Sequence, residues 1–199
     1  MKTGWPRPDL HPPCAGCGRR WFYGHAADCT TRASYSPASL PRVREVTLSE
    51  ADEAWALEIG RARNENALRR GFKPILPGSD TAAGDALGAR GELAAARAYE
   101  LEWRDPYRHD VQHMHDPDVG DLDVRTVERA AGTLNMRPRD VNDRVYLLVV
   151  AEGRRRYRMA GWLLGREAKQ DEFWRPADAR GPGWWAVPQD ALRDPWSVP

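Results

Sequence analysis

The sequence predicts an α/β fold in which helices flank a mixed β-sheet, preceded by a small metal-binding segment. Three observations support this prediction. The run at 145–150 is apolar throughout, as is typical of a central strand covered on both faces. Two stretches, 47–70 and 86–103, carry apolar residues at helical spacing. All three cysteines lie in the first 46 residues, where aliphatic residues are few.

The composition of the 199-residue chain indicates one main domain with a small appendage. We expect residues 1–46 to form a zinc knuckle and linker, and residues 47–199 to form the main domain. The formal charge is +1, so global charge does not indicate a nucleic-acid partner. No apolar run approaches membrane-spanning length, and the N-terminus does not resemble a signal peptide. We therefore expect an intracellular, cytoplasmic protein with no membrane partner.

The N-terminal segment has the spacing of a zinc site. Cys14 and Cys17 form a C-x2-C knuckle, and His25 and Cys29 follow at H-x3-C spacing. Three thiolates and one imidazole suit Zn²⁺, and so short a segment needs such a cross-link to fold. His11 is an alternative fourth ligand, and the sequence does not choose between it and His25.

Charged and aromatic residues lie inside this knuckle. Arg19, Arg20 and Trp21 combine groups that bind phosphate with a surface for stacking bases. They are candidate nucleic-acid contacts. The alternative is that the aromatic residues of the segment only cover the metal site.

Two helices are expected to begin the main domain. A capping box at 47–50 starts the first helix, which runs to about Arg70. The second helix covers 86–103, and its small residues permit close packing against a sheet. Glu92 lies on this helix outside the apolar stripe, where an ordinary surface acid would also fit.

Residues 121–126 are expected to form a short strand with two different faces. Asp121, Asp123 and Arg125 share one face because side chains alternate along a strand. A turn at Gly120 would bring Asp118 beside Asp123. Such crowded carboxylates repel one another unless a cation separates them, so this stretch predicts a divalent-metal site. The alternative is an acidic loop running into an edge strand.

Further strands are expected at 133–136, 145–150, 155–164 and 184–187. The second and third of these form a hairpin. Its tip carries Arg154, Arg155 and Arg156, which are candidate phosphate contacts. A solvated hairpin tip explains these arginines equally well.

The acidic stretch also resembles a known motif. Asp118, preceded by Pro117 and followed by Asp123-Val124-Arg125, is similar to the PD-(D/E)xK motif of the restriction-endonuclease-like nucleases, with arginine in place of the usual lysine. Small phage-type members of that superfamily share several further features in the same order. These are a Gly-x-x-Gly-Glu helix (Gly88 to Glu92), a strand running into 135–138, a Gly161-Trp162 strand and Val187-Pro188. The resemblance covers roughly residues 50–195.

The resemblance implies a restriction-endonuclease-like fold and a role for each motif residue. Asp118 and Asp123 would bind Mg²⁺ or Mn²⁺. Asp121 is a reserve ligand because it shares the strand face of Asp123, and the resemblance does not include it. Glu92 would assist the metal or orient its water. Arg125 would stabilise charge in the transition state, although arginine cannot act as a general base.

Three functional hypotheses follow. The first is a divalent-metal-dependent DNA endonuclease associated with a phage or mobile element, with DNA favoured over RNA. The second is a catalytically inactive nucleic-acid-binding protein on the same scaffold. The third is a zinc-stabilised adaptor.

Overall fold

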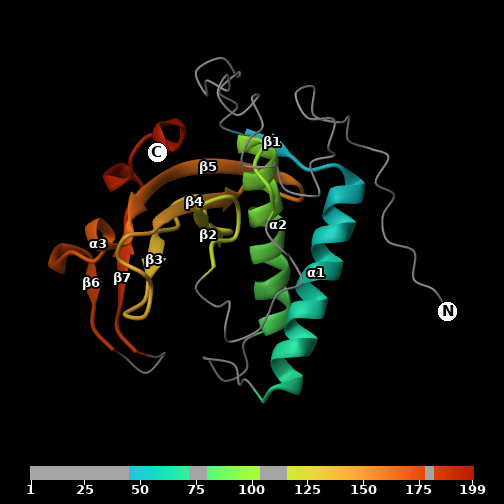
Figure 1. Ribbon diagram of the computed structural model, residues 1–199, viewed down its shortest axis with the longest axis horizontal. Coiled ribbons are helices and arrows are strands. Elements are labelled where there is room, and N and C mark those ends of the chain that lie inside the picture. Colours follow the sequence, from blue (N-terminus) through green and yellow to red (C-terminus); the bar gives the residue numbers. More distant parts are fainter. Residues whose placement is uncertain (1–44, 72–79, 104–115, 178–181) are drawn as a thin grey trace, which may run out of the picture. The chain divides into compact units, whose positions relative to one another are not determined.

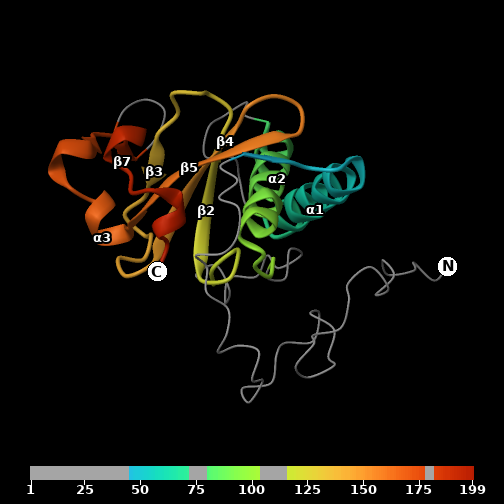
Figure 2. The ribbon, with the colours of Figure 1, turned by 90° about the horizontal axis from the view of Figure 1, so that it is seen from above.

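The computed structural model describes residues 45–71, 80–103, 116–177 and 182–199. The chain divides into two units, 1–41 and 42–199, and every described residue belongs to the second. That unit is built on a four-stranded sheet of order β1-β5-β4-β2. Two long helices cover one face of this sheet, and a three-stranded sheet of order β3-β7-β6 lies on the other side (Figures 1 and 2).

The strands are short apart from those of the central hairpin. Their bounds are β1 Glu45–Thr47, β2 Leu122–Val127, β3 Leu134–Met136, β4 Val145–Ala151, β5 Arg156–Leu164, β6 Trp174–Arg175 and β7 Trp184–Val187. β2 is parallel to β4, and all other pairings are antiparallel. The α/β class and the mixed sheet are thus confirmed. The sequence did not predict a second sheet, and it did not predict strands β1 and β6. Strand β1 falls largely in the expected linker.

Helix α1 (Glu50–Arg69) begins two residues later than the expected cap implied. The N-cap is Ser49, whose hydroxyl accepts from the backbone N–H of Asp52 while the Asp52 carboxylate accepts from Ser49. The capping box therefore joins Ser49 and Asp52, not Thr47 and Glu50. Thr47 instead ends strand β1.

Helix α2 (Thr81–Tyr99) begins and ends earlier than expected. Asp80 caps it by accepting from the backbone N–H of Ala83, and Glu100 ends it in the left-handed conformation at φ 53°. The expected start at residue 86 missed this Asp cap. A short helix α3 (Gly165–Ala168) and three single 3₁₀ turns, η6 (Asp171–Phe173), η7 (Gln189–Ala191) and η8 (Pro195–Ser197), complete the described elements.

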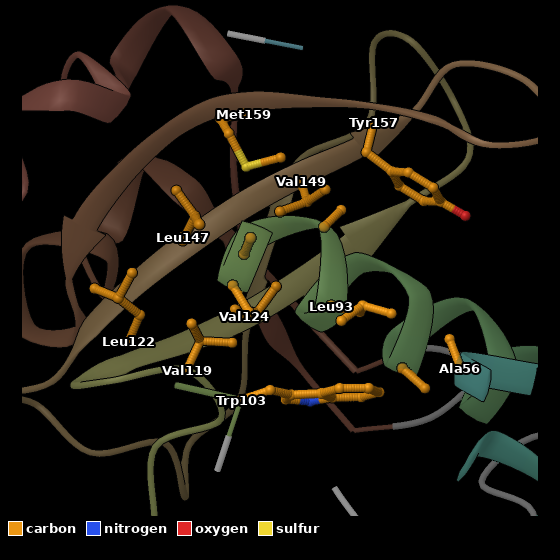
Figure 3. Close-up of a cluster of buried hydrophobic side chains, with 14 of the residues drawn as sticks. Ala56, Leu93, Trp103, Val119, Leu122, Val124, Leu147, Val149, Tyr157 and Met159 are labelled. Carbon is orange, nitrogen blue, oxygen red and sulfur yellow. The ribbon is translucent and has the colours of Figure 1, made fainter. Parts of the chain in front are cut away.

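Strand β4 separates two hydrophobic cores. Leu147 and Val149 point into the core beneath the helices, which Figure 3 shows around α2 and Trp103. Tyr146 and Leu148 point into the second core, against the three-stranded sheet. This alternation explains why the strand is apolar on both faces, as the sequence predicted.

The expected zinc knuckle lies outside the described residues. The same holds for the candidate nucleic-acid contacts within it. The residues concerned are Cys14, Cys17, His25, Cys29, Arg19, Arg20 and Trp21. Both assignments stay predictions.

Candidate active site

A tight turn brings Asp118 against the edge of β2. Gly120 adopts a positive φ of 55°, and the carbonyl of Leu122 accepts from the backbone N–H of Asp118 at 2.9 Å. Asp118 Oδ2 in turn accepts from the backbone N–H of Val124 at 2.8 Å. The turn that the sequence predicted at Gly120 is therefore present, and it fixes the Asp118 carboxylate on the edge strand.

Asp123 lies on β2 and is only 7% exposed. Its Oδ2 accepts from Nη1 of Arg144 at 3.3 Å. Its Oδ1 lies 2.9 Å from Nη1 of Arg125, but the angles do not make a hydrogen bond. Within the described residues, Oδ1 is thus a buried oxygen with an ionic neighbour and no hydrogen-bond donor.

Arg125 projects from the same face of β2 as Asp123. Its Nη2 lies 3.3 Å from Oδ1 of Asp140, and its guanidinium carbon lies 5.3 Å from the centre of the Tyr146 ring. Burial alone would lower the pKa of Arg125, but the carboxylates of Asp123, Asp140 and Asp118 outweigh it and raise that pKa. Arg125 is therefore a fixed positive charge and cannot accept a proton.

The two acids are held in an unfavourable environment for their charged forms. Burial, followed by the negative charges of Glu92 and Asp123, raises the pKa of Asp118 well above its ordinary value. Burial also raises the pKa of Asp123, and the charges of Arg125 and Arg144 offset only part of that effect. A cation bound between Asp118 and Asp123 would stabilise both ionised carboxylates.

Glu92 is buried and is anchored by other side chains. Its Oε1 accepts from Nη1 of Arg63 at 2.7 Å, and its Oε2 accepts from Nη2 of Arg63 at 2.6 Å and from Nε1 of Trp103 at 2.9 Å. Both oxygens are engaged, so this geometry favours a structural anchor over a direct metal ligand. The side chain of Arg63, on α1, is 11% exposed and pairs with Glu92 across the two helices.

Asp121 occupies a different position from the one the strand pattern implied. β2 begins at Leu122, so Asp121 lies in the turn before the strand, where it is exposed. Asp123 is thus the buried acid of the motif, Asp118 is partly buried beside the strand, and Asp121 is peripheral.

The arginines of the β4–β5 hairpin lie away from these acids. Asp123 is paired with Tyr146 at the start of β4, and the hairpin follows the end of that strand, roughly 17 Å further along. Each of these arginines approaches one carboxylate. The distances are 3.8 Å from Arg154 to Glu53, 3.5 Å from Arg155 to Glu50 and 4.0 Å from Arg156 to Glu152. Contacts between exposed groups at such distances are weak.

The residues fit a cation that keeps much of its water shell. Among the described residues, no three His, Cys, Asp or Glu side chains come together as a metal cage. Mg²⁺ is commonly held by only one or two protein carboxylates together with water and phosphate oxygens. Asp118 and Asp123 provide two carboxylates, and Oδ1 of Asp123 is a buried oxygen without a donor.

Comparison with protein families, curated proteins and solved structures gives no significant match. Within the described part of the chain, no helix has the length and apolar character needed to cross a membrane.

Proposed function

We propose that this chain is a divalent-metal-dependent DNA endonuclease, with its phosphodiester-hydrolysing site at Asp118 and Asp123. The observation that carries the proposal is the pair of acids at the edge of β2, of which Asp123 is buried and Asp118 partly buried. Burial is the main cause that raises the pKa of both carboxylates. Oδ1 of Asp123 is buried and has no hydrogen-bond donor among the described residues. Such a pair gains from a divalent cation, which is the cofactor that phosphodiester hydrolysis commonly uses.

Each residue has a defined role in this proposal. Asp118 and Asp123 would hold Mg²⁺ or Mn²⁺, which supplies charge neutralisation and an activated water when bound. Arg125 would donate to the phosphate oxygens as negative charge develops on them. Glu92 would act indirectly, because its bond to Trp103 and its ion pair with Arg63 fix the helix that lies beside the acids.

A second function is a nucleic-acid-binding protein that does not cleave. The observation in its favour is that Asp123 already has two guanidinium neighbours, Arg125 and Arg144. In the PD-(D/E)xK motif that this stretch resembles, a lysine usually activates the water. Arg125 stands in its place, and arginine cannot act as a base.

The decisive experiment incubates purified full-length protein with plasmid and linear DNA, with Mg²⁺, with Mn²⁺ and with a chelator. We expect cleavage only with metal, and no cleavage by Asp123→Asn. Arg125→Lys should keep or raise the rate, whereas Arg125→Ala should lower it by about a hundredfold through lost charge stabilisation. Binding without cleavage under all conditions would replace the first function with the second.

A further inference from the structure

A loop that follows β3 meets the candidate site through one carboxylate. This arginine loop, residues 137–144, contains Asp140, whose Oδ2 accepts from the backbone N–H of Arg137 at 2.8 Å. The other oxygen of the same carboxylate, Oδ1, lies 3.3 Å from Nη2 of Arg125. Asp140 therefore ties the beginning of the loop to the strand that carries Asp123.

The arginine loop is held firmly from within the protein. Nζ of Lys169 donates to the carbonyl of Pro138 at 3.2 Å and to Oδ1 of Asn142 at 3.0 Å. The hydroxyl of Tyr146 accepts from the backbone N–H of Val141 at 2.8 Å. A loop fixed at several points presents its remaining side chains in a defined position, which lowers the entropic cost of binding a ligand.

Two side chains of the loop have no such partners. Arg137 and Arg139 are exposed, and neither forms an ion pair or a side-chain hydrogen bond with any residue in the described ranges. Partial desolvation, followed by the positive charges of Arg139 and Arg125, lowers the pKa of Arg137. Arg125 is offset by Asp123 as well as by Asp140, whereas Asp140 is the carboxylate that offsets Arg137. An anion bound at Arg137 and Arg139 would relieve the repulsion between these guanidinium groups.

We propose that Arg137 and Arg139 bind the phosphate backbone of DNA next to the Asp118–Asp123 pair. The proposal rests on the proposed function, because the bound DNA is the same substrate. Arginine is suited to this role because its planar guanidinium binds two phosphate oxygens at once. The arginine loop, and not the β4–β5 hairpin, then positions the DNA strand at the acids.

The test measures binding of full-length protein to a fluorescein-labelled DNA duplex by anisotropy at several salt concentrations, with a chelator present so that no cleavage occurs. Arg137→Ala/Arg139→Ala should reduce the slope of log affinity against log salt by about 2, close to one unit for each lost phosphate contact. Arg137→Lys/Arg139→Lys should keep the slope, since the charge is retained. The control Arg61→Ala/Arg129→Ala removes the same charge from exposed positions elsewhere, and it should leave the slope unchanged.

Each other outcome overturns the proposal in an identifiable way. If the wild type binds DNA but the loop variant has the wild-type slope, the loop inference fails and the proposed function stands. If the loop variant and the control lose slope equally, the effect is one of total charge and the loop inference also fails. If the wild type does not bind DNA at all, the proposed function fails, and the inference fails with it.

Discussion

At the scale of single residues, the raised pKa of Asp118 makes a contribution of known sign to the pH dependence of stability. Its pKa is raised by burial and by Glu92 and Asp123, so the folded protein binds a proton more tightly than the unfolded chain does. The stabilisation from that proton is complete below the ordinary pKa of Asp, and it is lost as pH rises through the raised pKa. Wild-type stability should therefore fall by up to about 1.4 kcal/mol per pH unit in this window.

The first prediction is that Asp118→Asn removes this dependence. The amide oxygen of Asn still accepts from the backbone N–H of Val124, so the turn is kept. Urea unfolding of both proteins between about pH 4 and pH 8, without divalent metal, measures the effect. The advantage of the variant should grow with pH across that range. Parallel stability curves would contradict the electrostatic description of Asp118.

The second prediction separates the buried ion pair of Arg63 from an exposed one. Arg63→Ala leaves the buried carboxylate of Glu92 without its main partner, and we expect a loss of about 3 kcal/mol or more in the free energy of unfolding. Arg97→Ala breaks the more exposed pair with Asp52 and should cost less than about 1 kcal/mol. Chemical denaturation at neutral pH compares the two, and equal losses would show that the Glu92 pair is not a structural anchor.

The two acids could be predicted from the sequence, but their anchors could not. Strand alternation and one glycine were enough to place Asp118 beside the strand of Asp123, because these relations are local. The inward position of Arg63 could not be predicted, because its partner Glu92 is 29 residues away in sequence. Only the packing of α1 against α2 turns that arginine inward, and no local pattern encodes it.

At the scale of elements, the approach of α2 to β2 sets the geometry of the site. Gly91 faces Thr126 so closely that a Cβ at Gly91 would lie 1.8 Å from Oγ1 of Thr126. A Cβ at Gly84, on the same helix, would meet nothing within 4 Å. Packing therefore requires a glycine at position 91 of this helix but not at position 84.

The third prediction uses these two glycines as a matched pair. Gly91→Ala should destabilise the protein by about 2 kcal/mol or more, because the helix must move away from the strand that carries Asp123. Gly84→Ala should stabilise it by about 0.5–1 kcal/mol, since alanine is the better helix former. Thermal unfolding checks both, and a stable Gly91→Ala variant would show that the contact is looser than described.

Element type was easier to predict than element boundaries. The hairpin of β4 and β5 was predicted because long strands show their pattern of burial clearly. The caps at Ser49 and Asp80 were missed because several polar residues near each helix start are suitable caps, and backbone geometry selects one.

At the scale of the whole molecule, the described unit is two layers of β-structure with helices on one side (Figure 2). Strands β3 and β7 were expected, but their pairing into a second sheet was not, because they are distant in sequence and no local pattern encodes it. Strand β6 has only two residues, too few for a periodic signal. β1 was missed for the same reason. The unit 42–199 has its own two cores, so we expect it to fold without any metal that the N-terminal segment binds.

The fourth prediction concerns the zinc site and the independence of unit 42–199 from it. One Zn²⁺ should be bound by Cys14, Cys17, His25 and Cys29, and elemental analysis of purified protein should find about one equivalent. Cys17→Ser should lose the metal, whereas circular dichroism should show that the β-structure of 42–199 is kept. Less than about half an equivalent in the wild type, or no change in Cys17→Ser, would rule out the zinc knuckle.

The central claim is that Asp118 and Asp123 bind a divalent cation, and calorimetric titration with Mn²⁺ tests it most directly. The wild type should bind about one ion, with release of protons because the acids ionise on binding. Asp118→Asn should bind none, and Asp143→Asn, which alters an exposed carboxylate, should bind like the wild type. Absence of Mn²⁺ binding by the wild type, or equal binding by Asp118→Asn, would contradict the claim.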